Sequence, residues 1–357
     1  MGASGVGSRH RRLRHRGAVE FVTVTSKSED SVLTVRQESI ASVHRSGGIP
    51  TAVNFTLACL YIALNLYQFF ILPVWLLPAA PGWAWTLLPL AFLTNPFWSL
   101  IHEAIHDLFH PNRRVNAGFG RFLGILFGSP FRILRLSHLL HHKLNRLPVE
   151  GTEYYDRNRN SKASAAPGYY FQILYGLYLV EVISPLLFFL PKGWIRRFKD
   201  KLLRPESVSA ILMQNWLGDE ALREIRFDGV LTVSWLTLSF VCYGENWPLL
   251  LATLLARGFL ISFLDNVYHY ETPVSDIFYA KNLRLTWPMA KLLLNFNLHG
   301  IHHVNPAIPW IHLPKAFDAE SGHFHGDYFT ASLHQLRGPI ALQDLPHAAP
   351  VGSIRRT

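Results

Sequence analysis

Long apolar segments constrain the fold of this chain more than any other feature of its sequence. Four of them are apolar enough to act as membrane-spanning helices, and they form two pairs joined by short linkers: Val53–Leu72 with Ala84–Ile101, and Val230–Tyr243 with Leu249–Leu264. Charged residues make up only 16% of the chain, whereas they make up about a quarter of a typical soluble domain. We therefore expect an all-α integral membrane protein with four transmembrane helices in two hairpins.

The positive charge of the chain is concentrated between its apolar segments. The formal net charge is +10, and basic residues crowd the connection between the two hairpins, from Arg113 to Arg146. The positive-inside rule places such connections in the cytosol. This distribution favours a membrane protein over a nucleic-acid-binding protein, and it predicts a cytosolic helical cap on the two hairpins.

A fifth apolar segment, Gly168–Leu190, is long enough to span the bilayer, but basic residues follow it from Lys192 to Arg204. If this segment crossed, the chain before it and the chain after the second hairpin would lie on opposite sides of the membrane. We therefore expect a re-entrant or interfacial segment that enters the membrane without crossing it, broken at Ser184-Pro185.

Three regions follow from this pattern. Residues 1–48 are basic and then rich in Ser and Thr, which predicts a mostly disordered cytosolic tail. The other two are a membrane-embedded domain, residues 49–320, and a cytosolic C-terminal tail, residues 321–357. We expect no signal peptide, because no apolar core closely follows the basic N-terminal stretch. Two cysteines, Cys59 and Cys242, are too few for a disulfide framework, an iron–sulfur cluster or a zinc finger.

Three histidine clusters lie beside these apolar segments. The first is a His-x-x-x-His pair, and the second and third both read His-x-x-His-His. Residues four apart share one face of a helix, so each cluster can direct two imidazoles at one metal ion. Three such clusters are improbable as a chance arrangement, even among 18 histidines. The candidate metal ligands are His102, His106, His138, His141, His142, His299, His302 and His303.

The first cluster alone leaves several interpretations open. Its His-Glu-x-x-His string is typical of zinc peptidases in which the glutamate, here Glu103, acts as general base. Two histidines satisfied by hydrogen bonds at the membrane border are a structural alternative. Eight imidazoles together exceed the four ligands of a tetrahedral zinc site, so we expect two metal ions held jointly by the three clusters. Imidazole suits iron, copper, nickel and zinc alike.

The histidine pattern on two membrane hairpins resembles the membrane fatty acid desaturase superfamily, which includes related hydroxylases and carotenoid ketolases. The sequence after the third cluster, from Asn305-Pro306 to Leu313-Pro314, is also similar to the family, and the resemblance covers roughly residues 50–320. It implies a membrane non-haem di-iron oxidoreductase that uses O2. Its two Fe ions would lie on the cytosolic face, with an acyl chain held in a tunnel between the spans.

On this resemblance we expect a fatty acyl desaturase that introduces a double bond into an acyl-lipid, acyl-CoA or acyl-carrier-protein substrate. A hydroxylase or ketolase acting on a fatty chain or carotenoid is the nearest alternative, because these reactions share the first hydrogen abstraction. An intramembrane zinc metalloprotease is a more distant one. The sequence contains no nucleotide-binding glycine-rich loop and no haem-binding motif. Electrons would therefore come from an external donor, a ferredoxin or a flavoprotein reductase, attracted to the basic cytosolic face.

Residues beside the clusters complete the predicted site. The family often places a further ligand at the end of the last span, which makes His269 the predicted ninth ligand, with a histidine bonded to Asp265 as the alternative. Metal-bound imidazoles are usually oriented by hydrogen-bonding neighbours, although plain solvated side chains are equally compatible with the pattern. The candidates for this orienting role are Glu103, Asp107, Asn266 and Asn297.

Other histidines and one arginine fall outside this set. We assign no ligand role to His110, and we place His323 and His325 in a surface loop. Arg257 lies well inside the last span, where a charge is costly. We therefore expect it to pair with Asp265 or to face the tunnel.

Overall fold

The structure, a computed structural model, describes residues 48–346 except Thr152 and Ser321. It is mostly helical, which confirms the all-α part of the predicted fold class. Within this part of the chain two short strands, β1 (Tyr154–Tyr155) and β2 (Ile340–Ala341), pair in parallel. The predicted N-terminal tail lies almost entirely outside the described residues.

The first hairpin carries the first histidine cluster at its end. Thr51–Ala79 is a continuous 29-residue helical stretch, within which an 18-residue window has a mean hydropathy of 1.8. The returning arm is bent by 41° between Phe92 and Thr94, because Pro96 has no N–H to donate to the carbonyl one turn earlier. Its elements are α2 (Thr51–Leu66), η1 (Tyr67–Leu76), α3 (Leu77–Ala79), η2 (Pro81–Thr86), α4 (Leu87–Phe92) and α5 (Thr94–Ile105).

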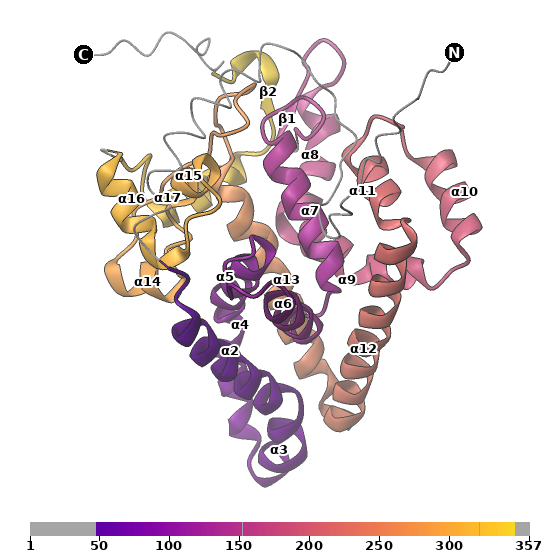
Figure 1. The fold of residues 1–357 in the computed structure, drawn as a ribbon. Helices are drawn as coiled ribbons and strands as arrows, with labels where there is room; N and C mark the ends of the chain where they lie inside the picture. The colour runs from indigo at the N-terminus through magenta and orange to yellow at the C-terminus, as the bar shows by residue number, and fades with distance from the viewer. Residues whose placement is uncertain (1–47, 152, 321, 347–357) are drawn as a thin grey trace, which may run out of the picture.

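The second hairpin consists of α12 (Asp219–Tyr243), the turn η4 (Gly244–Asn246) and α13 (Trp247–Asp265). Gly244 has a φ of 51°, a conformation that favours glycine because it has no Cβ. Both helices pack against Phe69. The ring centroid of Phe69 lies 5.7 Å from the ring centroid of Trp235 in α12 and 5.7 Å from Cζ of Arg257 in α13. The turn η4 reverses the chain between the two helices, and Figure 1 shows them meeting at the same end of the molecule as α3.

The fifth apolar segment forms α8 (Lys162–Phe171), η3 (Gln172–Gly176) and α9 (Leu177–Phe188). It is bent by 51° between Val180 and Val182, one turn before the predicted break at Ser184-Pro185. The difference has a physical reason, since a proline disturbs the helix at the carbonyl four residues before it. By length and composition, the described residues hold two candidate membrane spans. The number rises to as many as four if each bent pair is counted as one span.

A cap of shorter helices lies at the other end of the hairpins (Figure 1). Residues 328–345, which the sequence pattern assigns to a C-terminal tail, also pack onto this part of the molecule, and the side chain of Tyr328 is buried against Tyr268 and Leu283. The remaining elements are α6 (Arg113–Phe127), α7 (Phe131–Leu144), α10 (Lys192–Leu202), α11 (Val208–Trp216), η5 (Asn266–Tyr268), α14 (Trp287–Leu292), α15 (His299–Val304), η6 (Trp310–His312), α16 (Leu313–Ala319), α17 (Tyr328–His334), η7 (Gln335–Arg337) and η8 (Leu342–Asp344).

The main hydrophobic core lies where α5, α6 and α7 meet. Leu100 and Ile101 of α5, Leu123 of α6 and Leu134 of α7 are all fully buried in it. Burying an aliphatic side chain of this size contributes about 1.5–3 kcal/mol. This packing fixes the position of the two helices that carry the first and second histidine clusters.

Candidate metal centre

The three clusters reach the centre from three short helical segments. His102 lies in the last turn of α5, and His106 is its C-cap, with the His106 N–H donating to the His102 carbonyl at 3.2 Å. Asp107 then adopts a φ of 62° and ends the helix. The Asp107 carboxylate accepts from Arg135 of α7 at 2.8 Å, so the end of α5 is held against the helix that carries the second cluster.

The third cluster occupies the six-residue helix α15, which is too short to be stable alone. Its position is set by contacts with the extended segment beside it. The Ile301 N–H donates to Asn282 Oδ1 at 3.1 Å. A Cβ on Gly300 would lie 2.5 Å from the Ala280 carbonyl oxygen, so only glycine lets α15 approach this closely.

Five imidazoles form a first group. One nitrogen of each lies within 4.8 Å of the corresponding nitrogens of the others. Neighbouring Nε2 atoms face one another: His106 and His138 at 2.9 Å, His138 and His142 at 3.0 Å, and His142 and His302 at 3.0 Å. The group comprises His102, His106, His138, His142 and His302.

Four further imidazoles form a second group next to the first. His141 and His269 approach through their Nε2 atoms at 3.2 Å, and His299 and His303 do so at 3.1 Å. The rings of His142 and His303, one from each group, stack with centroids 4.3 Å apart. Residues from α5, α7, the end of the second hairpin and α15 therefore converge on one centre.

This geometry fits two metal ions. Two nitrogens bound about 2.1 Å from one ion at a right angle to each other lie about 3 Å apart, which is the separation seen within both groups. In the part of the chain that the structure describes, the buried Nε2 of His102 has no hydrogen-bond partner, and an unsatisfied buried polar atom is costly unless something binds it. A metal ion in each group would satisfy these nitrogens together.

The electrostatics favour the neutral form that binds metals. Burial lowers the pKa of His138, His299, His302 and His303 well below the usual value. Burial likewise lowers the pKa of His142 to about 3. These imidazoles are therefore neutral near pH 7, and a neutral imidazole is the form that offers a lone pair to a metal ion.

Glu150 orients one ligand of the second group. Its carboxylate accepts a hydrogen bond from Nδ1 of His141 at 2.6 Å, which fixes the tautomer and leaves Nε2 free to face the group. Burial alone would lower the pKa of His141, but the charge of Glu150 and this hydrogen bond raise it above the usual value. Nδ2 of Asn145 lies 3.2 Å from Nδ1 of His303.

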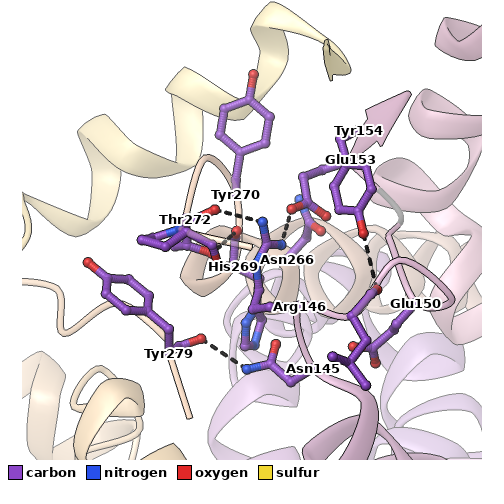
Figure 2. A network of polar contacts seen from close by, with 12 residues as sticks. Asn145, Arg146, Glu150, Glu153, Tyr154, Asn266, His269, Tyr270, Thr272 and Tyr279 are labelled. Atoms are coloured by element: carbon purple, nitrogen blue, oxygen red, sulfur yellow. Dashed lines mark hydrogen bonds and ion pairs between the residues drawn. The ribbon is translucent and has the colours of Figure 1, made fainter. Parts of the chain in front are cut away.

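Figure 2 shows the polar network that surrounds this side of the centre. Arg146 is buried and forms an ion pair with the buried Glu153, while its other nitrogens donate to the carbonyls of Thr272 at 2.7 Å and Pro273 at 3.1 Å. Arg146 therefore joins the loop after α7 to the loop after His269, and so fixes two ligand-bearing segments relative to one another.

The four residues predicted to orient imidazoles have other partners in the structure. Glu103 accepts from the Trp310 N–H at 3.1 Å, and Asp107 pairs with Arg135. Asn266 donates to Gln335 Oε1, and Asn297 donates to the Leu283 carbonyl, both at 2.9 Å. They hold the segments around the centre together. Two other residues, Glu150 and Asn145, have side chains within hydrogen-bond distance of the imidazoles. They have no periodic spacing that would single them out in the sequence.

The other histidines considered above lie outside both groups. Nδ1 of His110 accepts from the Asn112 N–H at 2.9 Å, and Nδ1 of His325 accepts from the Asn282 N–H at 3.0 Å. The ring of His323 packs on His325.

A cavity of about 510 Å³ opens beside the centre between α7, η3, α9, α11 and α13. His138, His141 and His269 line one side of it, and both groups therefore face the same space. The apolar part of the lining includes Trp98, Leu177, Val180, Leu212 and Ile261, and charged side chains such as Arg146, Glu150 and Asp265 line the cavity as well. A cavity of this size and lining suits an apolar small molecule or chain.

The described residues combine candidate membrane spans with two groups of histidines that could hold metal ions. The family model for fatty acid desaturase matches residues 80–331, which is more than half of the chain. The chain therefore belongs to the fatty acid desaturase family, a membrane-bound family of oxidoreductases. No curated protein and no solved structure matches it.

Proposed function

We propose that this protein is a di-iron, O2-dependent fatty acyl desaturase that introduces a double bond into an acyl chain. The observation that supports it most is that both imidazole groups border one cavity, part of whose lining is apolar. All nine predicted ligands, His269 included, lie in the two groups. Membership of the fatty acid desaturase family supports the same reaction.

The residues of this chain have distinct tasks in that reaction. The nine imidazoles would hold two Fe ions, which together with O2 would supply an oxidant strong enough to remove hydrogen from an unactivated carbon. Glu150 keeps the His141 ring in place through Nδ1. The apolar side chains of Leu177, Val180 and Ile261 bind the methylene chain and exclude water from the carbons beside the centre.

Lipid analysis of a host that expresses the protein tests this proposal. The intact protein should yield a new unsaturated acyl species. His302→Ala should abolish this product and should lower the amount of bound iron by at least half. His323→Ala is the matched control, because this exposed imidazole belongs to neither group. If the double bond forms equally well with His302→Ala, the proposed centre is wrong.

The same analysis separates the alternatives. A hydroxylase or ketolase with the same ligands would add oxygen to the chain, which raises its mass by about 16 or 14 Da, whereas a desaturase lowers it by about 2 Da. A zinc peptidase would need Glu103 beside a metal-bound water. Instead, Glu103 is buried and accepts from the Trp310 N–H, which disfavours the peptidase.

The proposed reaction needs partners that the chain does not contain. The substrate would be an acyl-lipid, acyl-CoA or acyl-carrier-protein, and two electrons would come from a ferredoxin or a flavoprotein reductase at the cytosolic face. Exposed cations such as Arg113, Arg114 and Lys201 favour an acidic donor through long-range steering. With donor limiting, turnover should fall as ionic strength rises; a rate independent of salt would exclude this mode of docking.

A further inference from the structure

A second group of polar side chains lies away from the imidazoles, between the two hairpins. Asn65, Gln68, Thr94 and Arg257 are each at most 5% exposed. They come from α2, η1, α5 and α13, and they line a cavity of about 20 Å³ together with the phenol ring of Tyr61. The rest of the lining is apolar. The space suffices for one small ion or one or two water molecules.

Each of these four side chains has a buried polar atom without a hydrogen-bond partner among the described residues. The atoms are Arg257 Nε, Gln68 Nε2, Thr94 Oγ1 and Asn65 Oδ1. Asn65 Nδ2 donates to the Tyr61 carbonyl at 2.8 Å, which fixes the orientation of that amide. Unused N–H and O–H donors therefore outnumber unused acceptors around the cavity, as in a site for a group that accepts hydrogen bonds.

The charge of Arg257 also favours a ligand that accepts hydrogen bonds. A guanidinium remains protonated in proteins, and a buried charge without an opposite charge is strongly unfavourable. Arg257 contacts the rings of Phe69 and Phe127, and its Nη2 donates to the Phe127 carbonyl at 3.5 Å. Among the side chains that the structure describes, however, no carboxylate forms an ion pair with it, and the expected partner Asp265 does not reach it.

The cavity is separate from the metal centre. The Phe127 ring lies between Arg257 and Trp98, with ring centroids of Phe127 and Trp98 5.7 Å apart. The ring of Trp98 in turn packs on the ring of His138, with centroids 6.3 Å apart. Two aromatic layers therefore divide Arg257 from the nearest imidazoles, so the ligand of this cavity is not a ligand of the metal ions.

We propose that this cavity is an intramembrane anion site, in which one monovalent anion binds Arg257 and completes the packing of the two hairpins. The anion is a halide from solution or the carboxylate of a free fatty acid from the lipid. Either one supplies the negative charge and the hydrogen-bond acceptors that the side chains of α2, η1, α5 and α13 lack.

Thermal unfolding of the iron-loaded, full-length protein in neutral detergent tests the site. At constant ionic strength, replacing gluconate by bromide should raise Tm by at least about 2 °C and then saturate. In a separate arm, decanoate is compared with decanol in gluconate buffer. A rise in Tm with decanoate alone assigns the site to a lipid carboxylate, and a rise in Tm with bromide alone assigns it to a halide. Equal Tm values in all of these conditions would overturn the proposal and leave only water in the cavity.

Variants connect the effect to the cavity. Arg257→Gln should abolish the anion dependence of Tm, whereas Arg223→Gln, which alters an exposed arginine of α12, should keep it. Persistence of the effect in Arg257→Gln would also overturn the site. If that variant does not fold, Gln68→Leu should raise the bromide concentration at half-effect several-fold. Bromide anomalous scattering from crystals of the unaltered protein should then show a peak between Gln68 and Arg257, and the absence of this peak would refute halide binding.

Discussion

Spacing along a helix reveals which side chains share a face, but it does not reveal which loops approach that face. The histidine clusters were therefore predictable, because four-residue spacing is a local property of the chain. The assignment of His141 to one group and His142 to the other was not, since it depends on how α7 packs between α5 and α15. Glu150 escaped prediction for the same reason, because its contact with His141 requires the loop after α7 to fold back.

Removing the Glu150 charge should weaken iron binding. In Glu150→Gln the imidazole of His141 loses its charge-assisted hydrogen bond, and losses of this kind typically cost about 10- to 100-fold in metal affinity. Titration of the iron-loaded protein with a competing chelator measures the change. Glu220→Gln, an exposed carboxylate at the start of α12, should leave the affinity unchanged; equal affinities in both variants would contradict the role of Glu150.

Arg146 should matter more for stability than an exposed arginine with a similar ion pair. Arg146 and Glu153 are 3% and 2% exposed, whereas Arg157 and Asp344 are 56% and 54% exposed. Arg146→Met removes the cation beside a buried carboxylate, which should lower the free energy of unfolding by about 3–5 kcal/mol. Arg157→Met should lower it by about 1 kcal/mol or less. Denaturant titration in mixed micelles compares the two, and similar losses would refute this account.

Among the elements, α15 has the strictest positional requirement. It is only six residues long, yet it supplies His302 to the first group and His299 and His303 to the second. The sequence predicted these ligands but not the tight contact of Gly300 with Ala280, because that contact joins segments twenty residues apart through the backbone.

A single methyl group at Gly300 should therefore displace the helix and disturb both groups. The added Cβ of Gly300→Ala would meet the Ala280 carbonyl at 2.5 Å, and overpacking of this kind costs about 1–3 kcal/mol. Elemental analysis should show that iron per chain falls from both sites together. Gly193→Ala in α10, where a Cβ meets nothing within 4 Å, should retain the full amount. An unchanged amount of iron per chain in Gly300→Ala would show that both groups tolerate the displacement of α15.

At the scale of the whole molecule, hydropathy predicts the helical class and the apolar segments, but it does not determine which of them cross the membrane. The bend between Val180 and Val182 is compatible with a broken span and with a re-entrant loop. Hydropathy averages over a helix and carries no information about the direction in which the chain leaves a bend. The crossing pattern is therefore a question for accessibility measurements.

Labelling of single cysteines with a membrane-impermeant maleimide tests the four-span arrangement. With Cys59 and Cys242 replaced by serine, we expect cysteine at Glu245, in the turn between α12 and α13, to react from the outer face. Cysteines at Asn160 and Glu206, which flank the fifth apolar segment, should both be protected in sealed cells and react only after permeabilisation. If these two positions differ, the segment between them crosses the membrane.

The two imidazole groups also set an order of events during synthesis. His302 completes the first group, and His299 and His303 complete the second, while the earliest ligand, His102, emerges about two hundred residues before them. A ribosome that has not yet reached α15 has made neither group in full. In the proposed enzyme, iron would therefore fill both groups only after α15 has been made, and a message truncated before residue 299 would yield a chain without either complete group.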